Sequence, residues 1–103
     1  MPAYMIINAD VHDPARFGEY ARTNAALVKR LGGRYLALGG ARDVLEGTWP
    51  TGKSVISEWP SREAALAYWH SDEYREVRKL REGICDAQVL LIDGVSPQGG
   101  EKA

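Results

Sequence analysis

Segments with the two-residue period of strands and the three-to-four-residue period of helices follow one another along the chain. The first, residues 3–11, is rich in apolar and strand-forming residues and predicts a strand. Asp13 is then placed to cap a helix and Pro14 to open it. Gly32-Gly33 is expected to end that helix. One face of it carries a mostly apolar stripe: Phe17, Tyr20, Ala21, Asn24, Leu27, Val28 and Leu31.

The middle of the chain is framed by glycines. Residues 35–38 predict a short second strand and Gly39-Gly40 a bend in it, after which residues 43–46 are expected to resume extended pairing. A turn is predicted at residues 49–52 and a third strand at residues 54–59.

The second half begins with a helix. Ser61 is a plausible cap for a helix through residue 70, and Ser71 for a further segment to about residue 83, so this second helix is expected to break near Ser71. Residues 87–92 predict the last strand, and residues 96–103 are expected to form a flexible tail.

The predicted order is β-α-β-β-α-β. This order is typical of the ferredoxin-like α+β fold, a four-stranded antiparallel sheet with two helices on one face. Because 103 residues leave no room for a second core, residues 1–95 are expected to form a single domain.

The second face of the predicted sheet raises a question of cover. The last strand is apolar on both faces, since Ala87, Val89 and Leu91 alternate with Gln88, Leu90 and Ile92, although the topology places it at an edge. An apolar open face needs a partner. We therefore expect a homodimer that packs two open faces together and encloses a barrel cavity.

Charge and composition narrow the class of partner. Thirteen basic and fourteen acidic side chains give a net charge of −1 without a block of like charge, which argues against a nucleic-acid or anionic-membrane binder. No apolar run is long enough for a signal peptide or a membrane span, and the lone Cys85 forms no internal disulfide. A cytoplasmic location is expected.

A set of short motifs runs through nearly the whole chain. They include Gly32-Gly33-Arg34-Tyr35, Gly39-Gly40, Glu46-Gly47 with Trp49, Trp59-Pro60-Ser61, Ala64-Ala65 with Trp69, Ser71 with Tyr74, Arg81 and Asp93-Gly94. In this ordered set the chain resembles the domain of unknown function 1330 family, within the dimeric α+β barrel superfamily. The resemblance implies a ferredoxin-like dimer and no established activity. The wider superfamily contains cofactor-independent monooxygenases, small isomerases and decarboxylases, which is an analogy of fold alone.

Arg81 and Glu46 are the leading candidates for chemistry. Arg81 shares a helical stripe with Tyr74 and Val77, which places a permanent charge on a mostly apolar face. Such a guanidinium needs an anion, and Glu46 is the expected partner. The pair either braces the second strand or shapes a cavity in which Arg81 binds a carboxylate or enolate and Glu46 acts as a base.

Other side chains are candidates for lining the same cavity. His70 is a candidate proton carrier, and the alternative is that it lies exposed at a helix junction. The expected ligand-binding residues are Tyr20, Asn24, Trp49, Trp69 and Tyr74. For these the alternative is that they pack in the core or at an interface. Neither a metal nor a cofactor is expected, since the acidic residues beside His12 suit helix capping.

Three classes of function remain open. The chain is a cofactor-independent enzyme for a hydrophobic oxo or hydroxy compound, a binder of a small organic acid, or a structural or regulatory dimer without catalytic activity. The first two predict a cavity that reaches solvent, whereas the third predicts that tryptophans and tyrosines fill it.

Overall fold

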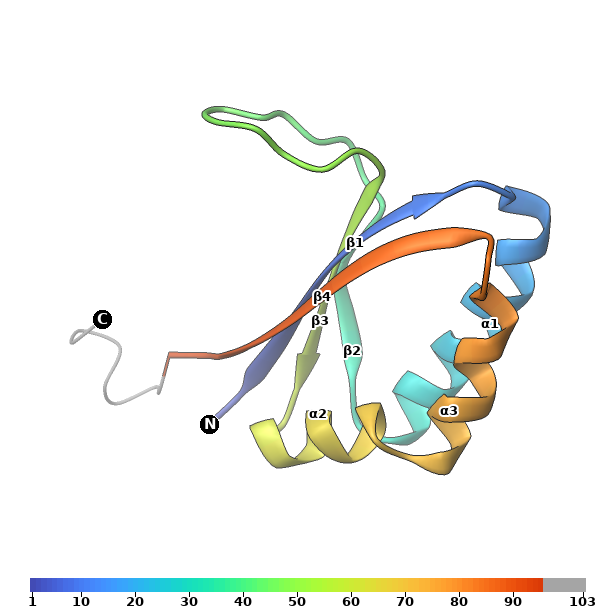
Figure 1. Cartoon of the computed structure of the whole chain (residues 1–103). Coiled ribbons are helices and arrows are strands. Elements are labelled where there is room, and N and C mark those ends of the chain that lie inside the picture. The colour runs from blue at the N-terminus through green and yellow to red at the C-terminus, as the bar shows by residue number, and fades with distance from the viewer. Residues whose placement is uncertain (96–103) are drawn as a thin grey trace.

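The computed structural model describes residues 1–95 of the 103-residue chain. Its four strands, β1 (Ala3–Val11), β2 (Arg34–Leu38), β3 (Lys53–Trp59) and β4 (Cys85–Asp93), form one antiparallel sheet in the order β2-β3-β1-β4. The helices lie together on one side of this sheet (Figure 1). The predicted ferredoxin-like α+β fold is confirmed. The tail predicted at residues 96–103 lies outside the described residues.

Helix α1 (Pro14–Arg30) begins and ends where its capping residues predict. The Asp13 carboxylate accepts a hydrogen bond from the backbone N–H of Arg16 at 3.2 Å, and Pro14 occupies the first turn. At the other end Gly32 takes a φ of 101°, which only glycine adopts readily, and the N–H of Gly33 returns to the carbonyl of Val28.

The second helical region is divided as predicted. Helix α2 (Arg62–Trp69) is capped by Ser61, and helix α3 (Asp72–Arg78) by Ser71, whose hydroxyl accepts from the N–H of Tyr74 at 3.0 Å. A single 3-10 turn, η1 (Lys79–Arg81), follows. Because Ser71 draws the first N–H groups of a new helix to its side chain, the chain starts again there instead of continuing α2.

Alternation along β1 decides which residues enter the core. Ala3, Met5 and Ala9 are buried under the helices, where Met5 joins an apolar cluster of residues from every helix and from β3. The buried cluster consists of Met5, Leu27, Val28, Trp59, Ala65, Tyr68, Tyr74 and Val77. Trp59 is 1% exposed, and its indole ring leaves no room for a side chain at Gly33. The core therefore lies between the sheet and α1, α2 and α3.

The opposite sheet face is open. Tyr4 and Ile6 alternate with the buried residues of β1, and Ile6 stands directly across from Leu90 on β4 and Ile56 on β3. Leu90 is 59% exposed and Ile92 51% exposed. No helix among residues 1–95 is long and apolar enough to cross a membrane.

The chain between β2 and β3 departs from the prediction. Residues 43–46 form no strand, so the expectation of extended pairing there is wrong. The register of β2 already shifts between Tyr35 and Ala37, before the glycine pair, and the chain leaves the sheet after Leu38. It re-enters the sheet at Lys53, directly after Gly52. The φ of Gly52 is 115°, and a side chain at this position would collide with the carbonyl of Ala9.

We call residues 39–52 the β2–β3 arm. In Figure 1 it projects beyond the ends of the strands and leans away from the helices.

Candidate functional site

A cavity of about 600 Å³ lies between the sheet and the helices. Its sheet side is mostly apolar, with Ile7, Val55, Ala87 and Val89 among its lining residues, although the charged Asp10 and Lys53 also line it. Helix α1 contributes Phe17 and small side chains. Ala21 and Leu38 line it and are themselves exposed, so the cavity reaches solvent. Its volume is in the range of pockets that hold small organic ligands.

Hydroxyl groups gather at the helix side of this cavity around Asn24, which is 7% exposed. The Tyr68 hydroxyl donates to Asn24 Oδ1 at 2.7 Å, and Asn24 Nδ2 donates to the hydroxyls of Tyr20 at 3.4 Å and Tyr35 at 3.5 Å. The hydroxyls of Tyr20 and Tyr74 share a hydrogen bond of 2.9 Å. One amide thus holds tyrosines from α1, β2 and α2 in fixed positions, and Tyr20 links them to α3.

Arg81 adds a positive charge to this group of hydroxyls. Its Nη2 donates to the Tyr74 hydroxyl at 3.4 Å, and its guanidinium carbon lies 5.5 Å from the centre of the Tyr20 ring. The side chain also lines the cavity. Within residues 1–95 no carboxylate forms an ion pair with Arg81. Its neighbours are phenols, which solvate the charge without neutralising it.

The protonation states of the cluster follow from burial. Burial raises the pKa of Tyr20 far above its usual value, and the neighbouring Tyr74 hydroxyl raises it further. Burial also raises the pKa of Tyr35 and of Tyr68. These hydroxyls therefore remain protonated and are suited to donate hydrogen bonds. Burial lowers the pKa of Arg81, but hydrogen bonding to Tyr74 and the nearby Tyr20 hydroxyl together raise it by more, so the guanidinium remains charged.

Contacts between aromatic rings hold the tyrosines of the cluster in place. Tyr68 stacks on Trp59 with ring centres 4.7 Å apart, and Tyr74 lies 4.8 Å from Tyr68 and 5.1 Å from Trp69. Such contacts fix ring positions as well as contributing stability. The hydroxyls are consequently held in place before any ligand binds.

The structure brings five of the eight predicted site residues together. Tyr20, Asn24, Trp69, Tyr74 and Arg81 line one cavity. Their roles remain predictions. Tyr20 and Asn24 are four residues apart on α1, and Tyr74 and Arg81 are seven apart in the second helical region, so each pair shares one helical face.

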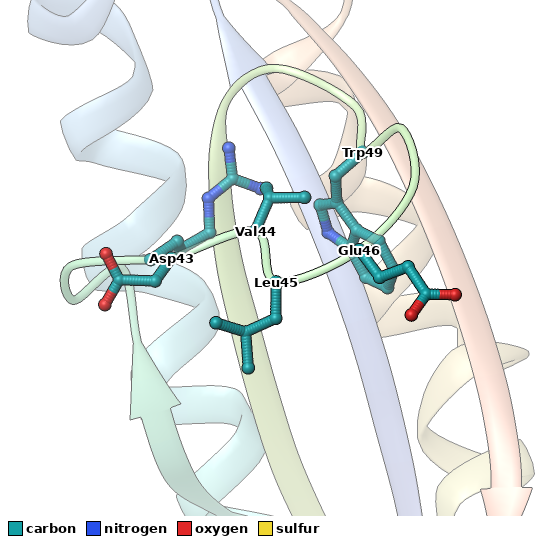
Figure 2. A pocket seen from close by; sticks show the side chains of 6 residues that line it. Asp43, Val44, Leu45, Glu46 and Trp49 are labelled. Carbon is teal, nitrogen blue, oxygen red and sulfur yellow. The ribbon is translucent and has the colours of Figure 1, made fainter.

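The other three candidates lie elsewhere. Glu46 and Trp49 are exposed on the β2–β3 arm, where they line a hollow of about 400 Å³ with Arg42, Asp43, Val44 and Leu45 (Figure 2). His70 is exposed at the C-terminal end of α2. The expected ion pair between Glu46 and Arg81 does not form within the described chain, because Glu46 extends into solvent while Arg81 contacts the tyrosines.

Sequence reasoning missed Tyr35 and Tyr68. Tyr68 follows the buried Ala65 by three positions on α2, which is a helical spacing that predicts a shared face. Tyr35 carries no comparable signal, because a strand of five residues alternates too briefly to assign its faces.

Cys85 also lines the cavity, and burial raises the pKa of its thiol, so it is not an activated nucleophile. Among residues 1–95 no three histidine, cysteine or acidic side chains stand close enough to hold a metal ion.

Comparisons with known proteins agree with this architecture. The family model "Domain of unknown function (DUF1330)" matches residues 2–95, so the chain belongs to this family. No curated protein matches the chain in sequence.

Solved structures resemble the chain in fold. A protein of unknown function from Rhodopseudomonas palustris has a TM-score of 0.75 at 21% identity, over 93% of this chain and 84% of its own. A putative antibiotic biosynthesis monooxygenase from Nitrosomonas europaea has a TM-score of 0.68 at 22% identity, over 93% and 92%. SnoaB, a cofactor-independent oxygenase from Streptomyces nogalater, has a TM-score of 0.61 at 15% identity, over 92% and 94%. At these identities the likeness shows the fold alone.

Proposed function

We propose that this member of the DUF1330 family binds a small organic compound in the cavity between sheet and helices. The compound has an apolar body and one anionic oxygen group, such as a carboxylate, a phenolate or an enolate. The observation that carries the proposal is Arg81, a charged guanidinium that lines the cavity and has only tyrosine hydroxyls as polar partners within the described residues.

Electrostatics favours an anion there. A charge in a partly buried site is costly unless an opposite charge or several hydrogen bonds compensate it. Within residues 1–95 the Arg81 guanidinium donates one side-chain hydrogen bond, to the Tyr74 hydroxyl at the long distance of 3.4 Å, and it lies near the face of the Tyr20 ring. An anionic oxygen beside Arg81 and the hydroxyls of Tyr20 and Tyr74 would supply the missing counter-charge and accept the remaining N–H donors.

The apolar wall determines the rest of the ligand. Ile7, Val55 and Val89 offer no hydrogen-bond partner to a polar substituent, so the body of the compound is hydrocarbon or aromatic. The cavity that remains between Trp69, the tyrosines and the sheet supports the proposal of ligand binding over the alternative of a structural or regulatory dimer whose cavity is filled by its own side chains.

We further propose that the bound compound is a substrate of a cofactor-independent enzyme. Arg81 and the one hydroxyl of the Tyr20–Tyr74 pair that does not donate to the other form a preorganised set of donors. Such donors favour the ionised form of an enol or phenol whose proton passes to water. The step that we assign to the site is this loss of a proton, which leaves an electron-rich enolate or phenolate held by Arg81. The fold shared with a cofactor-independent oxygenase supports this step by analogy.

Matched probes test the proposal by calorimetry. 2-Naphthoate and cinnamate are each titrated beside their primary amides, which keep the shape but lose the charge. We expect the acids to bind more tightly than the amides and Arg81→Met to weaken the acids about tenfold to a hundredfold, since a charged hydrogen bond contributes about 1.5–3 kcal/mol.

The matched control is Arg75→Met, which removes an equal charge from α3 where Arg75 pairs with Asp72 at the surface. This variant should bind the acids as the unchanged protein does. The proposal fails if no acid of a broad panel binds more tightly than its amide, or if both arginine variants behave alike.

We also propose that the chain forms a homodimer through the open sheet face. Exposed Leu90 and Ile92, with Ile6 and Ile56 beside them, form an apolar surface of a kind that a monomer rarely leaves in water.

A further inference from the structure

The β2–β3 arm exposes large apolar side chains that the body of the chain does not cover. Leu45 is 93% exposed, Trp49 57% and Val44 55%. Apart from the adjacent residues in the chain, no atom of residues 1–95 lies within 4 Å of the positions where Gly40 and Gly47 would carry a side chain, so these parts of the arm have open space around them. Apolar surface of this size at the end of a projecting segment is typical of an interaction site.

The root of the arm fixes the side on which it projects. Arg42 Nη1 donates to Asn8 Oδ1 at 2.9 Å, to Ser54 Oγ at 3.2 Å and to the carbonyl of Pro50 at 3.2 Å. Asn8 and Ser54 stand opposite each other on the open sheet face. Figure 1 shows the arm leaning away from the helices. The arm therefore lies on the side of the open face, not over the cavity of its own chain.

Most of the large exposed hydrophobics of residues 1–95 lie on these two surfaces. Leu36 on β2 and Leu90 and Ile92 on β4 alternate with side chains that face the helices, and Val44, Leu45 and Trp49 belong to the arm. A stable protein interface buries roughly 800 Å² per partner, which is more than a few side chains supply, and the arm and the open face together offer two adjoining apolar surfaces.

We infer that the β2–β3 arm is a docking element for a second copy of this chain. Each arm reaches past the edge of its own sheet and packs Leu45 and Trp49 against the partner, while the open faces pack against each other. The inference rests on the homodimer proposed above and adds to it the residues that hold the second copy.

Charge and the position of the arm beside the open sheet face favour a second copy as the occupant. The chain has a net charge of −1, and the arm carries both signs, with Arg42 beside Asp43 and Glu46. Neither surface has the single-sign potential that selects nucleic acid or an anionic membrane. Across a two-fold axis, by contrast, a basic group of each subunit can face an acidic group of the other. The hollow formed by Val44, Leu45, Glu46 and Trp49 (Figure 2) is open to receive a partner side chain.

Sedimentation over a range of protein concentrations tests the inference. Leu45→Ser combined with Trp49→Ser should raise the dimer Kd about tenfold or more, because buried aromatic and aliphatic anchors dominate interface energies. Leu66→Ser is the matched control, since Leu66 is a partly exposed leucine on α2, on the helix side. It should leave the Kd unchanged. Circular dichroism establishes that each variant is folded.

Tryptophan fluorescence locates the arm directly. The emission of the unchanged protein should shift to the red on dilution, as Trp49 leaves an apolar contact for water. The shift should be lost in Trp49→Phe. Leu90→Lys, which places a charge in the open face, should give a monomer whose emission is already shifted to the red.

The outcomes separate the arm from the dimer. A dimer whose Kd is unaffected by the double arm variant overturns the role of the arm and leaves the dimer standing. A monomer at all concentrations overturns both. A weakened dimer with the concentration-dependent shift supports both.

Discussion

Two regions of this molecule place a charged side chain beside aromatic rings, and only one of them is a built site. Arg81 lies with Tyr20 and Tyr74 between packed helices and a sheet, where every hydroxyl has a partner. Glu46 lies near Trp49 on the projecting arm, where both are exposed. In sequence the two look equally promising. The difference teaches that a preorganised site depends on the layers of structure behind a charge, not on the residue types adjacent to it.

The largest expected effect is the difference in stability lost when one side chain from each region is replaced by alanine. Tyr74→Ala should reduce the free energy of unfolding by about 3–5 kcal/mol, because it removes a buried aromatic side chain and leaves a cavity among Tyr68 and Trp69. Glu46→Ala should change it by no more than about 0.5 kcal/mol. Urea unfolding monitored by circular dichroism measures both. Equal losses in the two variants would contradict the contrast.

A smaller effect is expected from the amide that orders the hydroxyls. Asn24→Ala should reduce the free energy of unfolding by about 1–3 kcal/mol, since the Tyr68 hydroxyl loses its acceptor in a buried position. It should also weaken binding of aromatic acids without removing Arg81. Thr23→Ala, at the neighbouring exposed position of α1, is the control. If both variants unfold alike, Asn24 does not organise the cluster.

The smallest expected effect is the loss of folding stability at high pH that each buried tyrosine causes. The pKa values of Tyr20 and Tyr68 are raised in the folded chain above the usual 10.0, mainly by burial. The folded state then binds more protons than the unfolded state above pH 10. Below that pH these two groups do not change the free energy of unfolding. Above it, each of them lowers the free energy of unfolding by about 1.4 kcal/mol per pH unit.

Ultraviolet absorbance of phenolate and circular dichroism, followed together in rising pH, check this expectation. The absorbance of these tyrosines should increase only as the fold is lost, and Tyr20→Phe should move the unfolding transition to higher pH. Ionisation of Tyr20 and Tyr68 in a chain that is still folded would show that the hydroxyls are accessible to water and would weaken the case for a preformed donor set.

Much of the fold could be predicted because its signals are local. Asp13 with Pro14, Gly32 and Ser71 each fix a helix boundary through the hydrogen bonds of a single turn, and the structure places all of them as expected. The predicted last strand was too short at both ends, since Cys85 and Asp93 also pair with β1. Strand ends depend on the neighbouring strand, which local sequence does not describe.

The site could be predicted only in part for the same reason. A helical stripe contains Tyr20 and Asn24, and another contains Tyr74 and Arg81, so their shared direction is a local property. The contact between the two stripes depends on tertiary packing, because the 2.9 Å hydrogen bond between Tyr20 and Tyr74 joins residues 54 positions apart. Nothing local indicates that Glu46, between Gly39 and Gly52, would be carried away from the sheet.

By itself the sequence determined the order of the elements, the helix caps and the alternation that divides the sheet into a covered and an open face. These follow from interactions within a few residues. Only the tertiary structure decided that Arg81 would face a cavity with tyrosines and without Glu46, and that the arm would project on the open side. Both depend on how distant segments pack, and packing energy is distributed over contacts that no single segment contains.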